Sequence, residues 1–214
     1  FQDRDERHLD VVSLALRTGN WLLIGSPSYI KENGRTTLLN SAFLLSPDGR
    51  TIGQYDKVHL VPFGEYVPLR RFFPFISKIV AGIGDFRSGP GYEPLRMDGG
   101  RGSQKLGIMI CYEGILPEAG REYRQRGAGL LVNITNDAWL GNTSAPYQHL
   151  SMTVFRSVEN RLYLIRAANT GISAIMDPTG RIVTRSGLFE QAAIRGTIRF
   201  MDMNTFYSEY GDLF

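Results

Sequence analysis

The stretch KLGIMICYEGILPEAGREYRQRGAGLLVNITND, residues 105–137, decides the fold class. It begins with an apolar run typical of a buried strand, passes a Cys-Tyr-Glu-Gly turn, continues as a polar helix and ends in a second apolar run. A strand, a helix and a second strand in succession form the unit that builds parallel sheets covered by helices. We therefore expect an α/β fold.

The flanking segments extend this pattern in both directions. Residues 3–18 carry Leu9, Val12 and Leu16 on one apolar face and stop at Gly19, which predicts a helix. A second amphipathic helix is predicted over 145–161. Turn signals at 47–50 and 178–181 predict antiparallel hairpins. Further strands are expected over 21–29, 37–47, 162–170, 171–178 and 181–187.

The composition is that of one globular domain over residues 1–214. Hydrophobic residues make up 43% and charged residues 21% of the chain, whose length suffices for one large core. The net charge is only +3 and no run of five basic residues occurs, so we expect no nucleic-acid partner. No stretch of 18 apolar residues occurs, so these residues by themselves are expected to be soluble.

Cys111 is the single cysteine of the chain and lies where the apolar strand LGIMI ends. A lone cysteine is by default a small buried hydrophobe. A cysteine on a tight turn at a strand end instead projects its thiol into a cleft and presents the next backbone N–H, here that of Tyr112, to an oxyanion. This position favours a nucleophile about as much as an inert core residue.

A cysteine nucleophile needs a group that favours its thiolate. The three histidines, His8, His59 and His149, have no local signature that singles one out as a base. Lys57 and Glu65 flank an apolar turn. Either they form a solvated surface pair, or Lys57 supplies a fixed positive charge beside a thiolate and a developing oxyanion.

Residues 66–88 (YVPLRRFFPFISKIVAGIGDFRS) fit neither a strand nor a regular helix, because prolines and glycines interrupt the apolar period. The segment is either an irregular loop packed on its own domain or an arm or lid that touches a membrane, since exposed apolar surface marks interaction sites. The second interpretation predicts that Phe72, Phe73, Phe75 and Ile76 contact lipid or an acyl chain.

Four motifs, in order, cover nearly the whole chain. They are YDKVHLVPFGEYVPL (55–69), LGIMICYEGILPE (106–118), NITNDAWLG (133–141) and ENRLYLIRAANTGISAIMDPTGRI (159–182). Together they resemble the carbon–nitrogen hydrolase (nitrilase) superfamily. They are most similar to its membrane-anchored branch, the apolipoprotein N-acyltransferase family, as is the closing TFYSEYGDLF (205–214).

The resemblance implies a nitrilase-like α-β-β-α sandwich with a Glu–Lys–Cys triad, and neither a cofactor nor a metal ion. Lys57 matches the triad lysine and Cys111 the nucleophile. The resemblance assigns roles to six further residues: Glu65 is the supporting glutamate, Tyr112 and Glu113 shape the pocket, Trp139 flanks the substrate cleft, and Asn169 and Gly171 hold a strand turn.

The triad's general base has no match. In the family it is a glutamate in a Trp-Pro-Glu motif at the end of the first strand, and no such motif precedes the helix at 3–18. Asp5 and Glu6 lie within that helix and do not fit. The chain is thus expected to be cut from a longer protein at both ends, to lack the first strand of the family fold, and to be inactive by itself.

The function implied by the resemblance is acyl transfer at the periplasmic face of the bacterial inner membrane, in a membrane-anchored parent protein. Cys111 takes an acyl chain from a phospholipid as a thioester, which passes to the N-terminal amine of a diacylglyceryl lipoprotein. A soluble nitrilase-family amidase, passing the acyl group to water, is one alternative, against which the aromatic arm counts. A non-catalytic binding domain is the other, against which the retained Lys57, Glu65 and Cys111 count.

Overall fold

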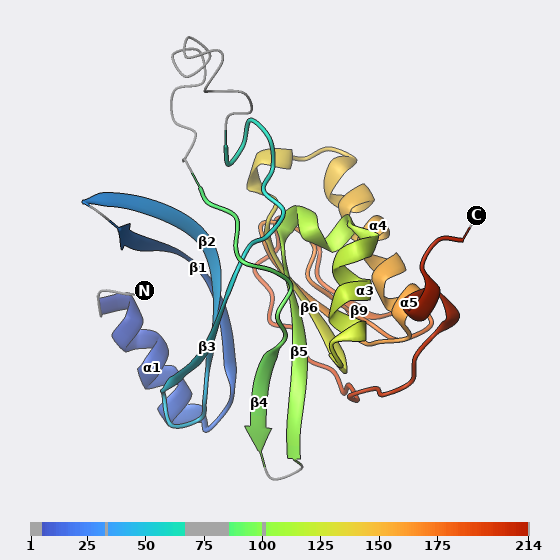
Figure 1. Ribbon diagram of the computed structural model, residues 1–214, viewed down its shortest axis with the longest axis horizontal. Coiled ribbons are helices and arrows are strands. Elements are labelled where there is room, and N and C mark those ends of the chain that lie inside the picture. The colour runs from blue at the N-terminus through green and yellow to red at the C-terminus, as the bar shows by residue number, and fades with distance from the viewer. Residues whose placement is uncertain (1–5, 33, 67–85, 100–101, 214) are drawn as a thin grey trace. The chain divides into compact units, whose positions relative to one another are not determined.

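The computed structural model describes residues 6–32, 34–66, 86–99 and 102–213 (Figure 1). The chain divides into two compact units, Phe1–Gly91 and Tyr92–Phe214, each with its own sheet. Helices and sheets of mixed direction agree with the predicted α/β class. That residues 1–214 form one domain stays a prediction.

The first unit contains an antiparallel three-stranded sheet, in the order β1-β2-β3, with the helix Glu6–Thr18 beside it (Figure 1). Its elements are α1 (Glu6–Thr18), β1 (Leu22–Glu32), β2 (Arg35–Leu45) and β3 (Thr51–Asp56). The hairpin predicted at 47–50 forms, with the Gly49 N–H donating to the Ser46 carbonyl at 2.9 Å. Gly49 has φ +77°, a conformation that glycine adopts without steric cost. The central strand β2 is buried without interruption from Ser41 to Leu45 and supplies the core.

Helix α1 buries the predicted apolar face only in part. Ala15 is fully buried, and Val12 lies against the β2–β3 turn, where a Cβ on Gly49 would come within 2.8 Å of a Val12 methyl group. Leu9 and Leu16 are 58% and 57% exposed. The same Cβ would stand 3.5 Å from Leu16 Cγ, so Leu16 borders the turn although most of its surface is exposed.

The second unit contains a six-stranded sheet in sequence order. Its strands are β4 (Leu95–Gly99), β5 (Gly102–Ile110), β6 (Leu130–Asn136), β7 (Leu164–Asn169), β8 (Ala174–Met176) and β9 (Ile182–Arg185). The β5-β6 and β6-β7 pairs are parallel, while β4, β8 and β9 pair antiparallel. The carboxyl ends of three parallel strands therefore meet at one edge, where ligands bind in open α/β sheets.

Helices cover this sheet and connect its parallel strands (Figure 1). They are the 3₁₀ helix η1 (Cys111–Ile115), α3 (Pro117–Gln125), the 3₁₀ helix η2 (Ala138–Leu140), α4 (Ala145–Asn160) and α5 (Phe206–Tyr210). Strand β5 lies close to α3, because Gly107 lacks a Cβ, which would stand 2.6 Å from Tyr123 Cγ. The Tyr123 hydroxyl donates to the Ile108 carbonyl at 2.5 Å and fixes this contact.

The segment around Cys111 follows the predicted order of strand, turn and helix. Strand β5 ends at Ile110, directly before Cys111, and a 3₁₀ turn separates it from α3, which begins at Pro117. Proline is favoured at the first position of a helix, because its fixed φ suits the helix and its missing N–H has no partner there.

Residues 67–85, the centre of the predicted arm, lie outside the described residues, so the arm stays a prediction. Where the chain is described on either side, the Phe63 N–H donates to the Tyr66 carbonyl at 2.8 Å and the Phe86 N–H to the Glu65 carbonyl at 3.0 Å. Among the described helices, none has both the length and the apolar character that crossing a bilayer requires.

Candidate active site

Cys111 begins a tight turn at the carboxyl end of β5. Its φ is +53°, in the left-handed region that residues other than glycine rarely adopt. The residue is only partly buried, and the chain continues as the 3₁₀ helix η1. A non-glycine residue held in this conformation indicates a functional constraint, because the surrounding structure has to hold it there.

Glu113 closes this turn from inside. Its side chain is fully buried, and Oε2 accepts a hydrogen bond from the Ile110 N–H at 2.7 Å. The carboxylate therefore ties the last residue of β5 to the turn that follows. The expected role of Glu113 in shaping the pocket stays a prediction, while its contact with the strand end is a feature that the sequence did not indicate.

Two side chains from other elements donate to the Cys111 carbonyl. Asn133 of β6 does so through Nδ2 at 3.3 Å, and His149 of α4 lies with Nε2 at 3.3 Å. Asn133 Nδ2 also donates to the Met109 carbonyl at 3.1 Å. Of the three histidines in the chain, His149 is thus brought to Cys111, but to its backbone and not to its sulfur.

Beneath these two donors lies a buried ion pair between Arg166 of β7 and Asp137. Arg166 Nη2 is 2.8 Å from Asp137 Oδ2, and both side chains are almost fully buried. Arg166 also donates through Nη1 to Asn133 Oδ1 and through Nε to the Ile172 carbonyl. Such extra hydrogen bonds are needed, because burying two charges costs more than their attraction returns unless every donor is satisfied.

The charges of this pair persist at neutral pH. Burial raises the pKa of Asp137, but the hydrogen bond with His149 and the positive charge of Arg166 outweigh it, so the pKa lies below its usual value. Burial lowers the pKa of Arg166, and Asp137 opposes that change. An arginine remains protonated in either case.

Asn133, Asp137 and Arg166 are site residues that the sequence reasoning missed. Asn133 and Arg166 interrupt the apolar strands LLVNITN and LIRAAN. Charged and amide side chains are seldom fully buried without a specific partner. Their place inside core strands was the available signal.

Lys57 and Glu65 form a second buried ion pair, in the first unit. Lys57 Nζ lies 2.6 Å from Glu65 Oε2, with the two side chains 1% and 7% exposed. Glu65 also accepts from the Val61 N–H at 2.8 Å and from Asn40 Nδ2 at 2.7 Å. The alternative of a solvated surface pair is therefore wrong.

The backbone fixes the direction of Lys57. Its N–H donates to the Asn40 carbonyl and its carbonyl accepts from the Gly89 N–H, each at 2.8 Å. Gly89 passes so close that a Cβ there would stand 2.1 Å from the Asp56 carbonyl oxygen. The strand end that carries Lys57 is held from both sides before any substrate arrives.

Of the other residues predicted from the sequence, two are exposed and two lie beside Asp137. Trp139 is 68% exposed, and its indole N–H donates to the Asn136 carbonyl at 2.7 Å. Tyr112 is also exposed. At the end of β7 the Asn169 carbonyl accepts from the Asp137 N–H at 3.1 Å, and a Cβ on Gly171 would lie 2.3 Å from Asp137 Oδ2. Asn169 thus contacts Asp137 and Gly171 leaves room for its carboxylate, while their expected role in holding the strand turn stays a prediction.

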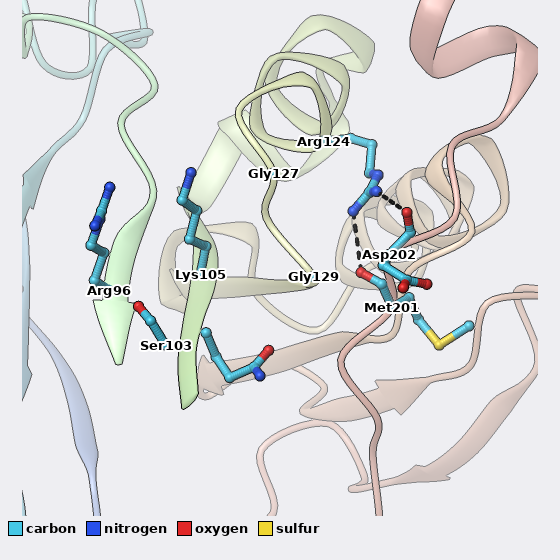
Figure 2. Close-up of a pocket in the computed structure, with 9 residues that line it drawn as sticks. Arg96, Ser103, Lys105, Arg124, Gly127, Gly129, Met201 and Asp202 are labelled. Carbon is cyan, nitrogen blue, oxygen red and sulfur yellow. Dashed lines mark hydrogen bonds between the residues drawn. The ribbon is translucent and has the colours of Figure 1, made fainter. Parts of the chain in front are cut away.

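A cavity of about 430 Å³ lies elsewhere in the second unit (Figure 2). Its lining residues are Arg96, Ser103, Gln104, Lys105, Arg124, Gly127, Gly129, Met201 and Asp202. Lys105 lies near the start of β5 and Cys111 follows its end, roughly 20 Å along a strand. Arg124 donates to the carbonyls of Met201 and Asp202 and so ties the chain after β9 to α3. The cavity is therefore separate from the Cys111 turn.

The described ranges contain no cluster of three or more His, Cys, Asp or Glu side chains arranged to hold a metal ion. The groups around Cys111 are an amide, an imidazole and backbone donors, and around Lys57 a single carboxylate. The surroundings of Cys111 can hold a thiol on a strained turn with hydrogen-bond donors fixed in advance. In the first unit, Glu65 holds the Lys57 cation in a fixed position.

A family model described as carbon-nitrogen hydrolase matches residues 6–206. The chain belongs to the carbon–nitrogen hydrolase family. The membership covers both units, including the Lys57 and Cys111 segments.

Curated relatives of this carbon–nitrogen hydrolase are considerably longer. An apolipoprotein N-acyltransferase from Geobacter metallireducens is 51% identical over 214 residues, which is 100% of this chain and 40% of that protein. Another, from Bdellovibrio bacteriovorus, is 38% identical over 183 residues, covering 84% of this chain and 34% of that protein. The chain spans about two fifths of the length of these relatives.

Solved structures confirm the predicted nitrilase-like α/β fold. A carbon-nitrogen hydrolase from Helicobacter pylori has a TM-score of 0.65 at 20% identity, over 87% of this chain and 64% of that chain. A mutant amidase from Nesterenkonia has a TM-score of 0.59 at 23% identity, over 86% of this chain and 65% of that chain. The latter is described as showing the Michael addition of acrylamide at the active-site cysteine.

Proposed function

We propose that this chain is the acyl-transferring domain of an apolipoprotein N-acyltransferase, with Cys111 as its nucleophile. The observation that carries the proposal is the turn at Cys111, where a lone thiol follows a core strand at φ +53°. A thiol in this setting fits covalent catalysis through a thioester.

Two comparisons support the choice of reaction. The Geobacter and Bdellovibrio relatives are both named apolipoprotein N-acyltransferase, and the Geobacter protein matches the chain from end to end. The Nesterenkonia amidase of the same fold is described as reacting with acrylamide at its active-site cysteine. The amidase alternative uses the same nucleophile and differs in the acceptor of the acyl group.

The proposed reaction has two steps. The Cys111 thiolate attacks the ester carbonyl of a phospholipid, the tetrahedral oxyanion collapses, and the lysophospholipid leaves as an alcohol after taking up a proton. The amine of a lipoprotein then attacks the thioester, loses a proton, and leaves as an amide while the thiolate is restored. The general base expected from the resemblance, a glutamate, takes the proton from the thiol and later from the amine.

Lys57 and the Tyr112 N–H are proposed to stabilise the oxyanion in both steps. A cation fixed in a buried turn needs no reorganisation when the negative charge develops. Glu65 holds the Lys57 ammonium in place, as its 2.6 Å contact supports. Trp139, exposed on η2, is proposed to border the substrate.

The proposed partners are a phospholipid acyl donor and a diacylglyceryl lipoprotein acceptor at the periplasmic face of the bacterial inner membrane. Both follow from the resemblance to the acyltransferases. The aromatic segment 66–88 is the proposed lipid contact within this chain, and most of it lies outside the described residues.

The test uses the full-length gene product, reconstituted with a phospholipid that carries a labelled acyl chain. The wild-type protein is expected to gain one acyl group as a hydroxylamine-sensitive thioester, because the thiolate is the only acyl acceptor before the amine arrives. Cys111→Ala is expected to gain none. Intact mass measurement and peptide mapping check both outcomes.

A diacylglyceryl-cysteinyl peptide added to the acylated wild type should discharge the label into an amide. Release of free fatty acid at the same rate with and without the peptide would favour the amidase instead. A label that accumulates on Cys111→Ala would remove Cys111 from the mechanism altogether.

A further inference from the structure

The direction of the Cys111 carbonyl determines the direction of the Tyr112 N–H. The two groups belong to one planar trans peptide, in which they point to opposite sides. Asn133 and His149 take hold of this carbonyl from inside the fold. The N–H that the mechanism offers to an oxyanion is therefore aimed by side chains that have no contact with the acyl carbon.

The orientation of the Asn133 amide is unambiguous. Its Oδ1 faces Arg166 Nη1, and a guanidinium can only donate hydrogen bonds. Its Nδ2 consequently faces the carbonyls of Met109 and Cys111, which can only accept. Arg166 thus sets the side of the amide that meets the nucleophile.

The same reasoning places a hydrogen on Nε2 of His149. Nε2 faces the Cys111 carbonyl oxygen and must carry a hydrogen to bond to it. Nδ1 lies 3.1 Å from both Arg166 Nη2 and Asp137 Oδ1. The Arg166–Asp137 pair therefore holds the ring from behind and keeps Nε2 directed at the turn.

The space around these side chains is closed by two glycines. A Cβ on Gly114 would stand 2.8 Å from Asn133 Nδ2, and a Cβ on Gly171 would stand 2.3 Å from Asp137 Oδ2. The backbone approaches the polar cluster so closely that its members have little freedom to turn away. The cluster of Asn133, Asp137, His149 and Arg166 is therefore preorganised.

We propose that His149 and Asn133 are positioning residues, which hold the Cys111 carbonyl and thereby the left-handed turn and the aim of the Tyr112 N–H. The inference rests on the proposed function only in requiring that Cys111 attacks a carbonyl, whichever acyl donor supplies it. His149 acts through the backbone and not as a base, because its Nε2 hydrogen is directed at the carbonyl oxygen.

The experiment compares two reactions of Cys111 in the full-length protein. Acylation by p-nitrophenyl butyrate passes through an oxyanion, whereas alkylation by iodoacetamide does not. The variants are His149→Phe, which keeps a ring without a donor, His149→Ala, which cannot clash, and His149→Gln, whose amide can donate. Gln148→Ala, an exposed neighbour on α4, is the control.

We expect acylation to fall about 10- to 100-fold in His149→Phe and His149→Ala, since a mis-aimed oxyanion donor loses most of its effect. His149→Gln should stay within about threefold of wild type, and alkylation should stay within about threefold in every variant. Thermal melting of each protein sets a temperature at which all are folded.

Three results would overturn the inference: unchanged acylation in both His149→Phe and His149→Ala, alkylation that falls in parallel with acylation, or His149→Gln no faster than His149→Ala. A failure of the proposed function is recognised separately. In that case the wild type reacts with p-nitrophenyl butyrate but forms no thioester from phospholipid.

Discussion

Each of the two units carries one buried ion pair among its candidate residues. Lys57 and Glu65 lie 2.6 Å apart, and Arg166 and Asp137 lie 2.8 Å apart. Both carboxylates accept further hydrogen bonds, Glu65 from Asn40 and Asp137 from Thr135. Since an unpaired buried charge destabilises a fold strongly, these pairs constrain where the backbone can lie.

The Asp137 carboxylate is expected to stabilise the fold in a pH-dependent way. Its pKa in the folded protein lies below the ordinary value of 3.8, because His149 and Arg166 favour the anion over the effect of burial. The stabilisation is therefore complete above pH 3.8 and is lost as the pH falls through the lower, folded value. Melting temperatures of wild type and Asp137→Asn, measured from pH 7 to pH 2.5, should converge only at the acidic end.

Asp48 and Asp177 also have lowered pKa values. They are present in both the wild type and Asp137→Asn, so their effects cancel in the difference between the two melting temperatures. A difference in melting temperature that stays constant down to the lowest pH would show that the Asp137 charge does not contribute.

The sequence singled out Cys111 and Lys57 as candidates because each lies in a distinctive local motif. The residues beneath Cys111 come from β6, α4 and β7, so their proximity depends on strand register, which no local pattern encodes. Asn133 and Arg166 were nevertheless recognisable as polar residues within apolar strands. His149 was considered, and without the fold nothing connected it to the Cys111 backbone.

At the scale of elements, predictions succeeded where a turn signal bounded an apolar run. The hairpins β2-β3 and β8-β9 form as expected. The short elements β4 and α5 were not predicted, because LRMDG and FYSEY have no sustained period. Strand β4 pairs with β5, and α5 is capped by Thr205, whose side chain accepts from the Ser208 N–H. Strand pairing and helix capping therefore stabilise these two elements, although their sequences lack a periodic apolar pattern.

The contact between β5 and α3 is expected to depend on Gly107. An added Cβ would stand 2.6 Å from Tyr123 and 2.8 Å from a Leu131 methyl group, inside a packed core. Gly107→Ala should destabilise the protein by about 1–3 kcal/mol, the usual cost of overpacking. Gly99→Ala, on the neighbouring strand with nothing within 4 Å of its Cβ, is the control. Thermal melting checks both, and equal melting temperatures would mean that α3 moves away without cost.

At the scale of the whole molecule, the candidate residues are divided between the two units. Lys57 and Glu65 belong to Phe1–Gly91, and Cys111 with its supporting cluster belongs to Tyr92–Phe214. The order of the motifs along the chain connects them to one family, whose model spans both units. The proposed reaction requires Lys57 and Cys111 to act on the same acyl group, which makes Lys57 the residue that tests it.

Lys57→Met in the full-length protein is expected to lower the rate of acyl-thioester formation by roughly two to three orders of magnitude, as for other losses of an oxyanion contact. Lys105→Met is the matched control, because Lys105 borders the cavity at the opposite end of β5. The labelled phospholipid assay measures both. A rate that falls equally in the two variants would point to a general effect of charge and not to a role of Lys57.

Stability has to be separated from chemistry in this test. Lys57→Met leaves the Glu65 carboxylate buried without its cation, which costs about 3–5 kcal/mol for a broken buried pair. The double variant Lys57→Met/Glu65→Gln removes that charge, and the Gln amide can still accept from the Val61 N–H that Glu65 contacts. Its melting temperature should return toward that of wild type while thioester formation stays low. Recovery of both together would reduce Lys57 to a structural partner of Glu65.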